Sequence, residues 1–128
     1  TSYPAYATSL GKALLSNKNK KELEKLYPKN FDKITENTLN NINELYQQIK
    51  QIKKEKIAIE IGEMNPQIEC MAIGIEHKNK IIAAISISYL IYYSNKAFRE
   101  KNKKILLEEK NKIEKVLKIY FNDLDTLY

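Results

Sequence analysis

Strict alternation of side-chain type over residues 80–88 constrains the fold of this chain more than any other feature. The segment reads Lys80-Ile81-Ile82-Ala83-Ala84-Ile85-Ser86-Ile87-Ser88. Successive side chains of a strand point to opposite faces, so Ser86 and Ser88 share a face with Ile82 and Ala84. A wholly buried strand gains nothing from hydroxyls that need partners. The pattern therefore favours a strand with one face in an apolar core and the other at a small polar pocket.

Two preceding segments, residues 57–62 and 68–76, continue this alternation. Their odd positions are bulky, namely Ile57, Ile59, Ile61, Met71, Ile73 and Ile75, and their even positions are smaller or polar, namely Ala58, Glu60, Cys70 and Ala72. Residues 77–80 are a plausible hairpin turn between the second and third strands. We expect a sheet whose odd face is a bulky core under helices and whose even face has room for a ligand. The alternative is that helices pack closely on the small residues and the serines bond locally.

Helical periodicity surrounds these strands and makes the fold class α+β. We expect helices over residues 6–16, 20–26, 37–54 and 95–121. Gly11 indicates close approach by backbone or ligand, and Thr35 or Asn37 is the expected cap of the third helix. The last helix is expected to bury one stripe, made of Phe98, Ile105, Leu106, Ile113, Val116, Leu117 and Tyr120.

Length and composition describe a single domain over residues 1–128. The net charge of +6 comes from a lysine-rich surface with one arginine, Arg99. Phosphate and base recognition favour arginine, so a solvated surface explains the charge better than nucleic-acid binding. The apolar run within residues 81–93 is interrupted by serines and too short to span a membrane. A lone cysteine, Cys70, forms no internal disulfide and fits a reducing cytoplasm.

The sequence gives little support for catalysis or for metal binding. Cys70 as a nucleophile needs a base, and the single histidine, His77, falls in the expected turn, where a solvated side chain is the natural interpretation. The histidine, cysteine and carboxylates show no metal-ligand spacing. We therefore expect a protein without catalytic residues, metal or cofactor, with a Cys70-dependent hydrolase as a less favoured alternative.

Three motifs in order resemble one family. Ala7-Thr8-Ser9-Leu10-Gly11-Lys12-Ala13-Leu14-Leu15 resembles the "hATxxGKALLA" opening of the effector-binding domain of IclR-type bacterial transcription regulators. Glu60-x-x-Glu63, ahead of Cys70-Met71-Ala72, is similar to the family's "D-x-E-E-x-x-x-G-x-x-C-I-A" stretch, and Ala83-Ala84-Ile85-Ser86-Ile87-Ser88 to its "AAxSxSGP" strand. The resemblance covers about residues 4 to 120, with departures at Gln67, Gly74 and Tyr89-Leu90.

The resemblance implies a GAF/profilin-like domain, an antiparallel sheet flanked by helices, that binds a small metabolite, usually a carboxylate. The family tethers this domain to an N-terminal winged helix-turn-helix, which we expect to be absent from this chain, as are the strands that precede the GK motif in the family. DNA would thus be a partner only through that missing module. An alternative is a sensor or oligomerisation domain of the same fold with another output.

The family's ligand-binding positions correspond here to Ser9, Leu10, Glu60, Ile68, Cys70, Ser86 and Ser88. Hydroxyl and thiol groups suit a carboxylate, and the start of the helix at residues 6–16 adds positive partial charge. Glu60 fits only if it is protonated or bonded to a ligand hydroxyl. Lys12 is a candidate for a charge in the pocket, but an exposed lysine or a member of an ion pair is the favoured interpretation. Tyr89, Tyr92 and Tyr93 suit either a subunit interface or a cover for the last helix, and the family's assembly implies a homodimer or homotetramer.

Overall fold

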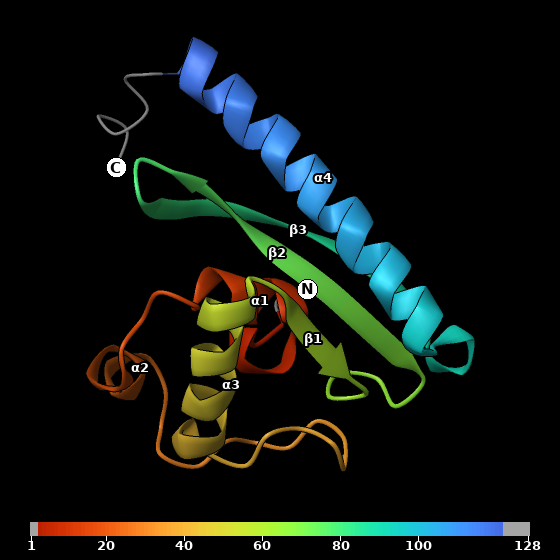
Figure 1. Cartoon of the computed structure of the whole chain (residues 1–128). Coiled ribbons are helices and arrows are strands. Elements are labelled where there is room, and N and C mark those ends of the chain that lie inside the picture. The colour runs from red at the N-terminus through yellow and green to blue at the C-terminus, as the bar shows by residue number, and fades with distance from the viewer. Residues whose placement is uncertain (1–2, 122–128) are drawn as a thin grey trace.

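The computed structural model describes residues 3–121 and shows an α+β fold, which confirms the expected class. An antiparallel sheet in the order β1–β2–β3 has α4 on one face and α1 and α3 on the other (Figure 1). The strands are β1 (Ala58–Ile61), β2 (Ile68–His77) and β3 (Lys80–Leu90). The helices are η1 (Ala5–Ala7), α1 (Ser9–Leu14), α2 (Lys20–Leu26), α3 (Ile42–Glu55), η2 (Ile91–Tyr93) and α4 (Lys96–Tyr120).

The β2–β3 hairpin turns at Lys78 and Asn79, whose φ angles are 50° and 68°. Positive φ at both central residues is the geometry of a two-residue turn that matches the twist of the strands. His77, expected to be solvated in this turn, is instead the last residue of β2 and only 4% exposed, so that prediction was wrong. The turn needs only two residues, and His77 therefore stays on the sheet face that α4 covers.

Both faces of the sheet are packed. The even face shows both expected features, because helices pack closely on one part of it and another part is left open for a pocket. On the odd face, Ile57, Met71, Ile73 and Leu106 of α4 form one buried cluster. On the even face, Ala58 and Ala72 belong to the larger core, together with residues of α1 and α3. Small side chains on β1 and β2 let α1 approach closely here. The larger core therefore lies on the even face and not on the isoleucine-rich face. The part of the even face beyond Ala58 and Ala72 is free to form a pocket.

Two helix starts differ from the sequence prediction. The helix expected over residues 37–54 begins at Ile42, and Asn41 caps it by accepting the N–H of Glu44 at 3.0 Å. Asn30 and Asn41 form an isolated β-bridge, which holds the chain extended just before the helix. The helix expected over residues 6–16 is divided at Thr8, which is extended. The helix over residues 20–26 is found as expected.

Helix α4 begins at Lys96, one residue after the predicted start at Asn95, which caps the helix instead. Most of its predicted buried stripe is wrong. Of the seven apolar residues, Leu106 alone is buried, while Ile105, Val116 and Tyr120 are exposed. The buried positions are Asn102, Leu106 and Lys110, one helical turn apart. α4 lies mainly along β2 and reaches β3 little, so only a narrow line of the helix is covered. Lys110 is accommodated because its ammonium donates to the Gly74 carbonyl at 2.7 Å.

No helix within residues 3–121 combines the length and apolar character needed to cross a bilayer.

Candidate functional site

The chain reverses direction at Thr8, and this places α1 over the sheet. Thr8 is extended, with φ −122° and ψ 148°, and its side-chain oxygen accepts the N–H of Gly11 at 3.0 Å. A Cβ on Gly11 would lie 2.4 Å from the Cα of Ala5. The close backbone approach expected at Gly11 is therefore confirmed, and η1 and α1 pack tightly because this residue is glycine.

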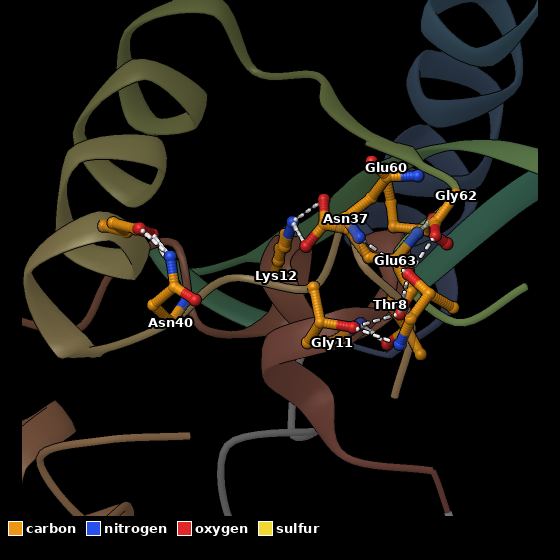
Figure 2. Close-up of polar contacts among 11 residues, drawn as sticks. Thr8, Gly11, Lys12, Asn37, Asn40, Glu60, Gly62 and Glu63 are labelled. Atoms are coloured by element: carbon orange, nitrogen blue, oxygen red, sulfur yellow. Dashed lines mark hydrogen bonds and ion pairs between the residues drawn. The ribbon is translucent and has the colours of Figure 1, made fainter. Parts of the chain in front are cut away.

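Lys12 follows Gly11 and lies entirely inside the protein. Its ammonium donates to both carboxylate oxygens of Glu63, at 2.8 Å and 2.7 Å (Figure 2). The expected ion pair is confirmed, whereas exposure of Lys12 is wrong, since the residue is 0% exposed. Burial lowers the pKa of Lys12 and raises that of Glu63, and the contact between them opposes both shifts. The pair joins the first helix to the loop after β1.

That loop, residues 62–67, positions Glu60 and Glu63. It starts at Gly62, where φ is +67°, in the region that favours glycine. Thr38 donates its hydroxyl to the Glu63 carbonyl at 2.6 Å. The Glu63 N–H donates to Oε2 of Glu60 at 2.8 Å. Thr35 donates its hydroxyl to the Gly62 carbonyl at 2.5 Å, so Thr35 and Thr38 both fix this loop. Neither Thr35 nor Asn37, the two expected caps, caps α3, and the Glu60 carboxylate is held at the end of β1.

Three side chains of the even face form a row across the sheet. The register pairs Glu60 of β1 with Cys70 of β2, and Cys70 with Ser88 of β3. The Cys70 sulfur lies 3.0 Å from the Ser88 hydroxyl oxygen, and either atom can be the donor. Ser86 lies opposite Ala72, next to the row. The alternation seen in the sequence thus brings an acid, a thiol and two hydroxyls to one area of the sheet.

Above this row lies a pocket of about 380 Å³. All seven residues expected to bind a ligand line it, namely Ser9, Leu10, Glu60, Ile68, Cys70, Ser86 and Ser88. Its other lining residues are Tyr3, Thr8, Met64 and Asn65, which sequence reasoning missed. They come from the N-terminal turn and from the β1–β2 loop, where no periodic pattern signals which side chain faces inward. Thr8 lies within the first family motif, and Met64 directly follows Glu63 of the second. Their position in or next to these motifs was the one signal in the sequence that could have placed them at the pocket.

Glu60 gives the pocket its electrostatic character. It is 2% exposed, and it is the only formally charged residue among the described lining residues. Burial raises the pKa of Glu60, although the N–H of Glu63 and the charge of Lys12 oppose the rise. The nearest cation, Lys12, is already bound to Glu63. A ligand therefore meets hydroxyl, thiol and amide groups and one acid.

The site shows no arrangement for nucleophilic catalysis or metal binding. Burial raises the pKa of the Cys70 thiol, and the Ser88 contact offsets this only in part, which disfavours the reactive thiolate. His77 belongs to the opposite face of β2. Within residues 3–121, no group of three histidine, cysteine or acidic residues is placed to hold a metal ion.

A larger hollow of about 500 Å³ lies between α2 and the start of α3. Most of its lining is exposed and polar, including Lys20, Glu24, Lys29 and Asn43. Side chains that are free in solvent must be ordered when a ligand binds, which weakens binding. The pocket over the sheet, with Ser9 and Glu60 buried and Cys70 bonded to Ser88, is the better candidate.

Comparison with known proteins supports one family. The model of the bacterial transcriptional regulator IclR C-terminal domain matches residues 1–115. Among solved structures, the IclR of Thermotoga maritima is 27% identical, with TM-score 0.79, over 88% of this chain and 47% of that one. The C-terminal domain of the Escherichia coli regulator KdgR is 22% identical, with TM-score 0.79, over 87% of this chain and 69% of that one. An IclR homologue from Microbacterium hydrocarbonoxydans, complexed with 4-hydroxybenzoate, is 20% identical, with TM-score 0.81, over 91% of this chain and 47% of that one.

No curated protein matches the chain. The chain spans about half the length of the longer regulators that it matches. The family match covers most of the chain, and the fold agrees with it. Members of this family are transcription regulators rather than enzymes. The chain belongs to the IclR-type bacterial transcriptional regulators and corresponds to their C-terminal, effector-binding domain.

Proposed function

We propose that this domain senses a small carboxylate metabolite in the pocket over the sheet and so controls DNA binding by an attached winged helix-turn-helix. The observation that carries the proposal is the row of Glu60, Cys70 and Ser88 beneath a pocket of about 380 Å³. Pockets of this size with a few convergent polar groups suit small ligands. In support, the Microbacterium homologue is complexed with a hydroxybenzoate.

Control of DNA binding follows if the ligand binds two conformations of the regulator with different affinity. The pocket spans three strands, the N-terminal turn and the β1–β2 loop, so a ligand contacts segments that are far apart in the chain. Self-association is part of this proposal. Tyr92 and Tyr93 are 79% and 53% exposed, and α4 exposes Ile105, Val116 and Ile119. Exposed aromatic and apolar groups of this kind are enriched at subunit interfaces.

The test is calorimetric titration of the protein with small carboxylates, including 4-hydroxybenzoate, alongside Ser88→Leu. The larger side chain fills the pocket floor, so we expect at least tenfold weaker binding. The matched control is Ala83→Leu, since Ala83 is exposed on the same strand but on the other face. Equal binding by wild type and Ser88→Leu contradicts the pocket assignment.

A further inference from the structure

The chemistry around Glu60 limits which acids fit the pocket. The structure describes no cation in the lining, and the nearby Lys12 is fully engaged by Glu63. A plain carboxylate would therefore place its negative charge near a buried acid whose charge no cation of the described lining offsets. Like charges in a partly buried site repel strongly.

Glu60 is held in the form of a hydrogen-bond acceptor. Its Oε2 accepts the Glu63 N–H at 2.8 Å, and this bond opposes the rise in the pKa of Glu60 that burial causes. One such bond uses one of about four acceptor positions of a carboxylate. The groups across the sheet from it are different. The Cys70 thiol and the hydroxyls of Ser9, Ser86 and Ser88 can all donate.

We propose that the ligand is an acid with a hydroxyl or ammonium group next to its carboxylate, and that Glu60 accepts a hydrogen bond from that group. The hydroxyl and thiol groups then receive the carboxylate. This inference rests on the proposed function and names the ligand class of the same pocket. Glu60 is the specificity-determining residue, because an acid without the donor leaves the other acceptor positions of this buried carboxylate without a ligand partner in the complex.

The test compares three probes that differ only at the carbon next to the carboxylate: propionate, 2-hydroxypropionate and 2-aminopropionate. Binding is followed at pH 7.5 by backbone amide shifts of the residues that line the pocket. We expect one donor-bearing probe to bind roughly tenfold to a hundredfold more tightly than propionate, the effect of one hydrogen bond to a charged group. The tighter of the two identifies the donor. Propionate binding as tightly as both overturns the inference.

A matched pair of variants assigns this selectivity to Glu60. Glu60→Gln should reduce it to about threefold or less, because a neutral amide accepts more weakly and also donates. Glu76→Gln removes a carboxylate elsewhere in the sheet and should leave it unchanged. Selectivity that survives in Glu60→Gln overturns the inference.

Acidification provides the same test if Glu60→Gln fails to fold. The titratable groups around Glu60 are Lys12 on α1, Glu63 on the β1–β2 loop and Cys70 on β2. The preference over propionate should fall as the pH is lowered through the folded-state pKa of Glu60, which the amide shift of Glu63 reports because that N–H is bonded to the Glu60 carboxylate. A preference that stays constant while the Glu63 amide shows Glu60 being protonated overturns the inference. If 4-hydroxybenzoate shifts the pocket amides and none of the three probes does, the inference alone is overturned. If neither the three probes nor the other small carboxylates shift them in any of these proteins, the proposed function itself fails, and the inference with it.

Discussion

Lys12 and Glu63 are joined by two hydrogen bonds of 2.8 Å and 2.7 Å across 51 positions of sequence, entirely within the protein. The lysine side chain is 0% exposed and the glutamate 6%. A buried ion pair costs desolvation energy that only its mutual contact repays. This contact fixes the β1–β2 loop, and with it the position of Glu60.

Removal of one partner of this pair should strongly destabilise the folded protein. We expect Lys12→Met to lower the free energy of unfolding by about 3–5 kcal/mol, because it leaves Glu63 charged, buried and unpaired. The double variant Lys12→Met/Glu63→Leu should lose clearly less than the sum of the two single variants. Urea denaturation followed by circular dichroism measures all three. Additive losses would contradict the direct coupling.

Gly11→Ala tests the close approach between η1 and α1. The added methyl would lie 2.4 Å from the Cα of Ala5, which is backbone and cannot move aside alone. We expect a loss of about 1–3 kcal/mol in the free energy of unfolding, as for other overpacked sites. The control is Leu14→Ala, a substitution on the same helix at a side chain that is 43% exposed, which should cost less. Thermal unfolding of both variants decides the point.

Glu69 and Glu60 should make opposite contributions to the pH dependence of stability. Glu69 is fully buried and accepts hydrogen bonds from Arg99, Tyr89 and Ser94. Burial alone would raise the pKa of Glu69, but these bonds together lower it. A lowered folded-state pKa gives stability that is present above the unfolded value, about 4.3, and lost as the pH falls through the folded value. Glu69→Gln should therefore flatten the acid loss of stability.

For Glu60 the sign is reversed, because burial raises its pKa. Its ionisation costs stability as the pH rises from the unfolded value through the folded value. Glu60→Gln should therefore lose less stability than wild type between pH 4 and pH 7. Urea unfolding at intervals of half a pH unit measures both variants. Identical pH profiles for wild type and either variant would contradict the corresponding assignment.

Cys70 should react slowly with iodoacetamide. Burial raises the pKa of its thiol, so the thiolate that reacts is scarce at pH 7.5. We expect alkylation of the folded protein at least tenfold slower than in 6 M urea, with further slowing when a ligand occupies the pocket. Mass spectrometry follows the added mass, and Cys70→Ser is the control. Rapid alkylation would reopen the case for a nucleophilic thiol.

The strands and the pocket floor were predictable because they depend on local alternation. Period two placed Glu60, Cys70, Ser86 and Ser88 on one face, and the structure brings all four to one pocket. The family motifs added Ser9 and Leu10, which lie on a separate element. Helix α2 was also found where it was expected, and the structure adds a reciprocal capping box of Asn19 and Glu22 at its start, which the sequence prediction did not use.

Apart from His77, which depends on the length of the turn, the errors share a different cause, which is long-range contact. Lys12 is buried because Glu63 meets it, and no local pattern reports a partner 51 residues away. The buried line of α4 depends on where that helix crosses β2, so Ile105 and Val116 stay exposed while Lys110 is covered. The start of α3 depends on the bridge between Asn30 and Asn41, which competes with helix over residues 37–41.

The pairing of Cys70 with Ser88 has a consequence for folding. If β3 slid by one residue along β2, Ser86 and Ser88 would turn toward α4, and Ile85 and Ile87 would fill the binding site. A bound metabolite is therefore compatible with one alignment of the hairpin only. Its binding would stabilise only those molecules in which the hairpin has the correct register, and these molecules would resist unfolding more strongly.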